Sequence, residues 1–270
     1  MKKAFPLVAI LCLLICKSVF AYAEKTSDNI GIDEKLGQSI PLDLTFRDEK
    51  GTDVKLRNLV DKPTVLTLVY YHCSHICPQM LLGLAEVLSK LELVPGRDYK
   101  VVTLSFDDMD TPATAGDLKR NYVKAINKPF PEDSWRFLTG DRENIKKISD
   151  AAGIKYKKVM HGFIHPEVLI FLSRDGKITR YLHVSKFEYG VGYPVTFLAA
   201  DFSGALADAS KGIVSAGIKR TPLLCFPHEP SLQEKFFRIL GILGMVTILL
   251  LVSLFIYLKV AGNKSSGGMK

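Results

Sequence analysis

Cysteine is scarce in this sequence, and the few copies are unevenly placed. The 270 residues contain 5 cysteines, and Cys12 and Cys16 lie in a predicted N-terminal export signal. The mature chain would therefore keep Cys73, Cys77 and Cys225. Three cysteines cannot all be paired within one chain, so at least one is expected to be a reactive or metal-binding thiol.

Charge is also nearly balanced once the two ends of the chain are set aside. The net charge is +8, but six lysines lie close to the ends, and removing these six leaves +2 for residues 24–258. The six are Lys2, Lys3, Lys17, Lys259, Lys264 and Lys270. Because this surplus of positive charge is so small, the basic composition of the whole chain is not evidence for nucleic-acid binding. We also find no internal repeat and no low-complexity segment.

The first 23 residues have the pattern of a secretory signal peptide. Two lysines precede an apolar stretch from Phe5 to Cys16, and Ala21-Tyr22-Ala23 provides a small-x-small cleavage site. The sequence therefore predicts that residues 1–23 are removed and that the remaining chain is exported.

The other end of the chain has a long stretch without charge. Ile239 to Leu258 contains 20 uncharged residues, enough for a helix to cross about 30 Å of hydrocarbon. Lysines but no acids follow the stretch, which favours a cytoplasmic tail. We therefore predict a transmembrane helix over 237–259, a cytoplasmic tail over 260–270 and a main domain outside the bacterial cytoplasmic membrane.

Between these ends, the pattern predicts an α/β domain over residues 41–216, flanked by linkers over 24–40 and 217–236. Alternating apolar residues around the turn Asp48–Gly51 predict an N-terminal β-hairpin. Strands are then expected to alternate with helices, and a second hairpin closes the sheet. The expected strands are 63–71, 101–106, 135–138, 166–172 and 178–183, and the expected helices are 78–91, 112–125, 142–152 and 194–215.

The dithiol lies where the first buried strand ends and the first long helix begins. The run Pro63 to Tyr71 is apolar and rich in β-branched residues, and apolar residues after Cys77 recur at helical spacing. A helix N-terminus favours thiolate over thiol. At this spacing Cys73 and Cys77 are close enough for a disulfide or a shared metal, so a plain structural disulfide is the alternative to a functional dithiol.

These features resemble the thioredoxin fold, in which a segment with a cis proline faces the dithiol. Here the similar segment is Ile164 to Phe171, with Pro166 as the expected cis residue. The three residues between the cysteines and the histidine before the proline resemble the Sco/SenC family of membrane-anchored copper proteins, and a C-terminal anchor resembles one bacterial subgroup. Other segments similar to that family are Ser105-Phe106-Asp107 with Thr111-Pro112, Trp135 to Gly140, and Phe171-Leu172 with Asp175 to Lys177.

The resemblance implies a copper site with Cys73, Cys77 and His165 as ligands. Thiolates and imidazole suit copper, and a three-coordinate site leaves room for a ligand from a partner. His161 is the alternative histidine. The implied function is that of a metallochaperone for the binuclear copper centre of cytochrome c oxidase subunit II.

The same dithiol supports a second hypothesis of a different class. A thiol–disulfide oxidoreductase would use Cys73 and Cys77 with a thiol reductant partner, and it would not need His165. Other side chains are left open in the sequence. His72 and His75 flank the dithiol and are either exposed or able to tune it, and Cys225 with His228 is either a second metal-binding pair or an ordinary loop.

Overall fold

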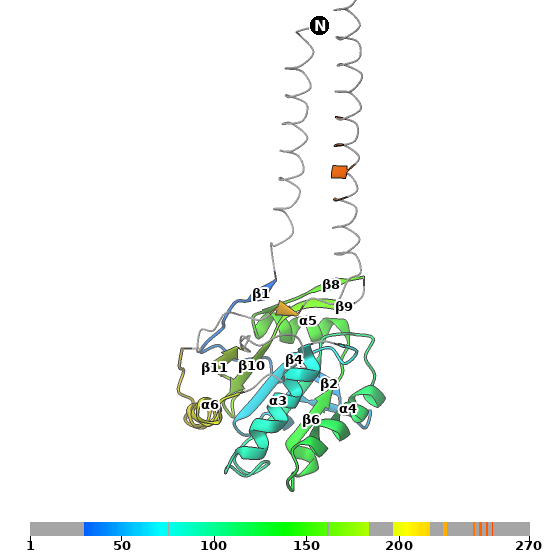
Figure 1. Cartoon of the computed structure of the whole chain (residues 1–270). Helices are drawn as coiled ribbons and strands as arrows, with labels where there is room; N and C mark the ends of the chain where they lie inside the picture. The colour runs from blue at the N-terminus through cyan, green and yellow to red at the C-terminus, as the bar shows by residue number, and fades with distance from the viewer. Residues whose placement is uncertain are drawn as a thin grey trace, which may run out of the picture. The chain divides into compact units, whose positions relative to one another are not determined.

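The computed structural model describes residues 30–74, 76–160, 162–183 and 197–216, the backbone of 224–225, and a few positions between 240 and 250. The chain divides into two units, residues 1–227 and 228–270. Figure 1 shows the helices and strands of the first unit. The few described positions of the second unit are helical.

A five-stranded mixed sheet forms the centre of the first unit, in the order β11-β10-β4-β5-β6. β4, β5 and β6 run parallel, whereas β10 is antiparallel to both β4 and β11. Every residue of β4 and β10 is buried, as expected for central strands covered on both faces. The bounds are β4 Thr64–Val69, β5 Lys100–Ser105, β6 Trp135–Leu138, β10 Val168–Leu172 and β11 Ile178–His183.

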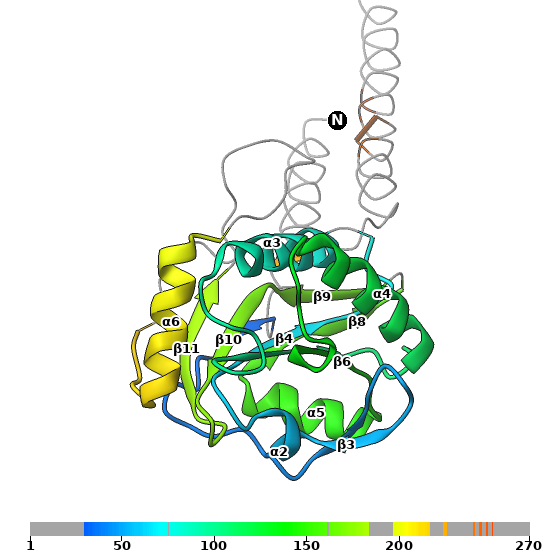
Figure 2. The same cartoon turned by 90° about the horizontal axis from the view of Figure 1, so that it is seen from below.

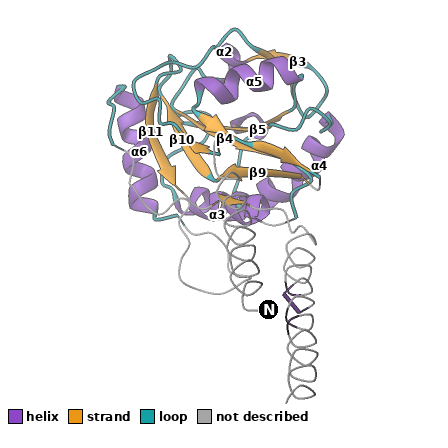
Figure 3. Cartoon of the chain, turned by 90° about the horizontal axis from the view of Figure 1, so that it is seen from above, coloured by secondary structure: helices purple, strands orange, loops and turns teal. Residues whose placement is uncertain are grey.

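Helices cover both faces of this sheet. Figures 2 and 3 show α3 and α4 on one face and α5 with the short α2 on the other, while α6 lies beside β11. The sequence explains the ends of several helices, since Thr111 and Asp141 cap α4 and α5 with their side chains and Pro112 opens α4. The bounds are α2 Leu56–Leu59, α3 Ile76–Lys90, α4 Pro112–Ala125, α5 Arg142–Ala151 and α6 Ala199–Lys211.

The central strands and helices agree with the sequence-based expectation, and apart from the last helix their ends coincide with the expected ones or are displaced by one or two residues. The predicted N-terminal hairpin is present as β2 Thr45–Arg47 and β3 Asp53–Lys55. The expected strand 166–172 begins later, at Val168, because Pro166 belongs to the preceding strand β9. The expected helix 194–215 is shorter where it is described, since α6 ends before Gly212 in the left-handed conformation.

Two small sheets were not expected from the sequence. β1 Gly31–Ile32 pairs with β7 Ile154–Lys155, and a three-stranded sheet joins β8 Lys157–Val159, β9 Gly162–Pro166 and β12 Leu224–Cys225. Part of the stretch that we expected to be linker, residues 24–40, therefore pairs with the domain. Gly153 permits this pairing, because it has φ +69° and a Cβ there would lie 1.9 Å from the carbonyl oxygen of Asp33.

The predicted membrane segments lie almost entirely outside the residues that the structure describes. The signal peptide over 1–23 is not described, and the predicted transmembrane helix over 237–259 has only scattered described positions. Within the described part of the chain, no helix is both long enough and apolar enough to cross a membrane. Both segments, with the tail over 260–270 and the domain boundaries, stay predictions.

Candidate metal centre

Cys73 and Cys77 lie at the junction between β4 and α3, as the sequence predicted. Cys73 precedes the helix, and its backbone N–H donates to the carbonyl oxygen of Tyr70 at 3.3 Å. Cys77 is the second residue of α3. The two thiols are not joined in a disulfide, and both are buried, with exposed fractions of 7% and 2%. The structure therefore does not contain the structural disulfide that was the alternative to a functional dithiol.

His165 lies far from the two cysteines in the sequence but next to them in the structure. It lies on β9, is fully buried, and its Nε2 is 3.5 Å from the Sγ of Cys77. The Cys73 side chain also forms a hydrogen bond with His165. The structure therefore brings together all three residues that the resemblance implied as ligands.

Glu167 is a fourth member of the site, and the sequence analysis did not identify it. Its Oε1 lies 3.5 Å from Cys77 Sγ and 3.4 Å from His165 Nε2. Among the described residues, Cys77, His165 and Glu167 form the one group able to surround a metal ion. The sequence did contain a signal for Glu167. Residues i and i+2 of an extended chain point to the same side, so Glu167 is expected to face the dithiol together with His165.

Hydrogen bonding orients the imidazole of His165 toward the sulfur atoms. Its Nδ1 lies 3.2 Å from the carbonyl oxygen of Pro166. A carbonyl oxygen can only accept, so this bond requires the proton to be on Nδ1. In the neutral ring Nε2 then keeps its lone pair for a ligand, which is the arrangement found in metal-binding histidines.

Burial and mutual attraction shift the protonation of this cluster. Burial opposes the charged form of His165, but the Glu167 carboxylate and the Cys73 side chain outweigh it, so the pKa of His165 is raised above 6.5. Burial raises the pKa of Glu167 to about 7, against the attraction of His165. Protons and a metal ion would therefore compete for the same buried donors near neutral pH.

Aromatic side chains form an apolar wall around His165. The rings of Phe106 and Tyr70 lie 4.8 and 5.8 Å from the imidazole ring, and both also contact Phe163. Such a wall restricts water and holds the imidazole in one orientation. The geometry is that of a dry site with two sulfur donors, one nitrogen donor and one oxygen donor.

The profile of the SCO1/SenC family matches residues 33–189, more than half of the chain. The chain belongs to the SCO1/SenC family. This confirms the resemblance drawn from the sequence motifs, including the mixed α/β, thioredoxin-like fold.

Individual relatives agree with this membership of the SCO1/SenC family. A SCO1 homolog from Bacillus subtilis is 26% identical over 141 residues, which is 50% of this chain and 69% of that protein. A mitochondrial SCO1 homolog from Arabidopsis thaliana is 32% identical over 114 residues, 42% of this chain but only 31% of the plant protein. The crystal structure of an Aquifex aeolicus protein assigned to electron transfer is 30% identical, with a TM-score of 0.55, covering 66% of this chain and 95% of that one.

One expectation about the SCO1/SenC site is wrong. We expected Pro166 to follow a cis peptide bond, as the thioredoxin resemblance implied, but the described residues contain no cis peptide bond. Pro166 instead ends β9, whose backbone pairs with β8 and β12. His165 reaches the dithiol from this extended strand without a cis turn.

The other candidate ligands have different positions. The side chain of His72 is 65% exposed, and its Nδ1 lies 2.5 Å from Asp110 Oδ1, outside the metal-binding group. The backbone of Cys225 in β12 lies opposite His165 in register. His75, His161 and His228 lie outside the described residues, so the alternative ligand His161 and the Cys225–His228 pair stay hypotheses.

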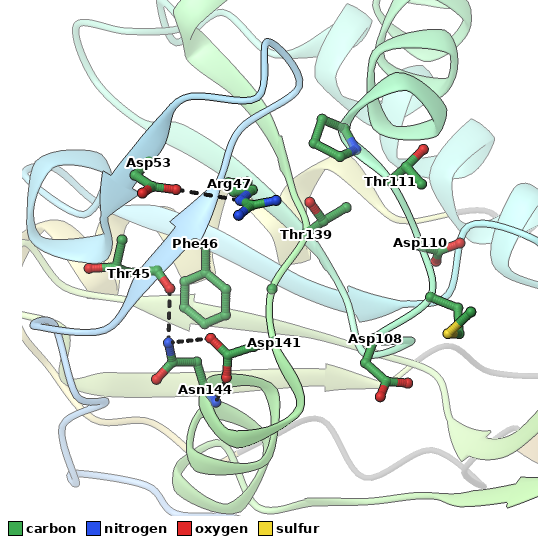
Figure 4. A pocket seen from close by; sticks show the side chains of 13 residues that line it. Thr45, Phe46, Arg47, Asp53, Asp108, Asp110, Thr111, Thr139, Asp141 and Asn144 are labelled. Carbon is green, nitrogen blue, oxygen red and sulfur yellow. Dashed lines mark hydrogen bonds and ion pairs between the residues drawn. The ribbon is translucent and has the colours of Figure 1, made fainter.

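A pocket of about 550 Å³ lies elsewhere on this SCO1/SenC domain (Figure 4). It is lined by β2, the loop Asp108–Pro112 and the start of α5, and it contains neither cysteine. Arg47 pairs with Asp53 at 3.6 Å on one side, and Asn144 donates to Asp141 and to the Thr45 carbonyl oxygen. These polar groups are thus satisfied within the protein, and the pocket offers neither a thiol nor an imidazole, its sulfur atom being the thioether of Met109.

Proposed function

We propose that this protein is a copper metallochaperone that holds one copper ion through Cys73, Cys77 and His165. Its proposed client is the binuclear copper centre of cytochrome c oxidase subunit II, as its family resemblance implies. One observation carries the ligand set: Cys77 Sγ and His165 Nε2 approach within 3.5 Å although 88 residues separate them in the chain.

The chemistry of the donors supports copper as the cargo. Cu(I) is soft and favours thiolate sulfur, and imidazole suits copper as well. Two thiols and one oriented imidazole can surround such an ion within an apolar wall. Loading would displace protons from both thiols, and exchange with ligands of a client would move the ion onward.

A thiol–disulfide oxidoreductase is the second candidate, favoured by the reduced dithiol at the start of α3. One thiolate would attack a disulfide of an exported client, and the second would resolve the mixed disulfide. A thiol reductant partner would then restore the dithiol. Both thiols are nearly buried, so this function requires the client to reach them through the loop that carries Cys73.

The proposed location is the extracytoplasmic side of a bacterial cytoplasmic membrane. The predicted signal over residues 1–23 and the predicted helix over 237–259 support it. Export would suit both candidate functions, because the client centre and the client disulfides lie outside the cytoplasm.

Substitution of His165 distinguishes the two functions. We expect the reduced full-length chain to bind one copper per molecule, and His165→Ala to weaken Cu(I) binding by more than about tenfold, since it removes a ligand and not merely a neighbour of one. The dithiol should still oxidise and reduce. Competition with a Cu(I) chelator, elemental analysis and thiol counting measure these properties.

His183→Ala is the matched control, since His183 is also buried but pairs with Glu34 instead of the dithiol. His161→Ala should cost less copper affinity than His165→Ala. Loss of copper in His161→Ala with retention in His165→Ala would contradict the ligand assignment. If the wild-type protein binds no copper but cycles its dithiol, the oxidoreductase is the better description.

A further inference from the structure

Glu167 is a buried carboxyl group that the proposed copper chemistry does not require. Its side chain is fully buried. In the described part of the chain it forms no ion pair with a lysine or arginine, and its one ionic neighbour is His165. Its second oxygen, Oε2, is also buried and has no hydrogen-bond partner there. A carboxyl group placed this way is costly unless something in the site compensates it.

The distances within the cluster match those around a metal ion. Cys77 Sγ, His165 Nε2 and Glu167 Oε1 form a nearly equilateral triangle with sides of 3.5, 3.5 and 3.4 Å. In a tetrahedral site, two ligands are separated by about 1.6 times the bond length, and bonds to zinc-like ions run from about 2.0 Å for nitrogen and oxygen to about 2.3 Å for sulfur. Such a site would therefore have edges of roughly 3.3–3.7 Å, so the triangle has the size of one tetrahedral face.

Cys73 supplies none of these three ligand atoms but lies beside the group. Its side chain hydrogen-bonds with His165 and acts electrostatically on Glu167. It therefore approaches the triangle from the loop that precedes α3.

We propose that Glu167 is a fourth ligand of this centre when the centre holds a divalent transition-metal ion. This inference rests on the proposed function, because it uses the same two thiols and imidazole. A carboxylate oxygen is a hard donor that suits divalent ions better than Cu(I). Two thiolates and a carboxylate carry three negative charges, which a divalent ion neutralises more completely than a monovalent one in a buried site.

Cobalt(II) is the probe for this fourth ligand, because its absorption bands report coordination and it does not oxidise thiols. The full-length protein would be titrated with Co(II) and separately with Cu(I) against a chelator, under anaerobic and reducing conditions. We expect E167Q to lower Co(II) affinity at least tenfold and to change the visible bands, while Cu(I) affinity changes by less than about threefold. E86Q is the control for loss of a carboxylate charge, since Glu86 lies on α3, the helix that carries Cys77, but pairs with Lys90 at the surface.

The outcomes separate this inference from the proposed function. Equal Co(II) binding and equal bands in wild type and E167Q would overturn the inference, as would equal losses of both metals or a wild type that binds Cu(I) but not Co(II). A wild type that binds Co(II) through Glu167 but no copper would instead overturn the proposed function alone. Should E167Q fail to fold, E167D keeps the charge on a shorter side chain, and unchanged Co(II) affinity in E167D would equally contradict the inference.

Discussion

Asp110 organises the loop that carries the dithiol. Its buried carboxylate accepts hydrogen bonds from the Tyr71 backbone N–H at 2.7 Å and from Ser105 Oγ at 2.5 Å, and it also contacts His72 Nδ1. These bonds hold the chain between β4 and Cys73 against the end of β5. Asp110 therefore supports the approach of the first cysteine to the site by holding the backbone of the loop at Tyr71.

Replacement of Asp110 should reveal this support. We expect Asp110→Ala to lower the free energy of unfolding by about 2–3 kcal/mol, because a buried backbone N–H and a hydroxyl lose a charged acceptor. His72→Ala is the control, and it should cost less than about 1 kcal/mol because the side chain of His72 is mostly exposed. Urea unfolding of both variants measures the difference, and equal losses would show that Asp110 serves only to hold His72.

At the scale of elements, a buried ionic cluster joins the N-terminal hairpin to the sheet and to α4. Glu49, in the turn between β2 and β3, pairs with Lys119 of α4 at 2.6 Å and with Arg136 of β6 at 3.0 Å. Arg136 also pairs with Asp48 at 2.5 Å. All four side chains are largely buried, so removal of one partner leaves an uncompensated charge.

This cluster should make the fold sensitive to acid. Burial alone would raise the pKa of Glu49, but Lys119 and Arg136 outweigh it and lower the pKa below 4.5. A lowered folded-state pKa means that the contribution is complete above about pH 4.5 and is lost as the pH falls through the folded-state pKa. Glu49→Gln should therefore lower the unfolding free energy by about 3 kcal/mol at pH 7 and flatten its decline below pH 4.5.

Chemical unfolding between pH 3 and 7 measures this effect. Glu143→Gln is the matched control, since Glu143 pairs with Lys147 on the exposed face of α5 and should contribute no more than about 0.5 kcal/mol. A parallel pH dependence in wild type and Glu49→Gln would rule out the cluster as the source of acid sensitivity.

At the scale of the whole molecule, the predicted arrangement is an exported domain with a C-terminal anchor. The lysines after Leu258 and the signal pattern over 1–23 both favour a cytoplasmic C-terminus. This orientation would place the dithiol, His165 and Glu167 on the side where the proposed client lies.

A reporter that is active only in the cytoplasm tests the orientation. Fused after Lys270, the reporter should be active, because the predicted helix over 237–259 would return the chain to the cytoplasm. Fused after residue 216, before that helix, the same reporter should be silent. Activity in the second fusion and silence in the first would reverse the proposed topology.

The sequence alone determined the local parts of this protein. Buried β-branched runs, helical spacing and turn residues predicted the central strands, the helices and the N-terminal hairpin, because these signals are carried by neighbouring residues. They also placed Cys73 and Cys77 at the start of a helix. The family motifs added His165, and the structure brings it to the dithiol.

Only the tertiary structure decided which distant side chains meet. Glu167 joins Cys77 across 90 residues, and the short β1, β8 and β12 take partners that no local pattern specifies. Likewise, Pro166 lies at the end of a strand, β9, that pairs with β8 and β12, and the described residues contain no cis peptide bond. Local periodicity shows which face a residue occupies, but the packing of that face against another element decides what the residue contacts.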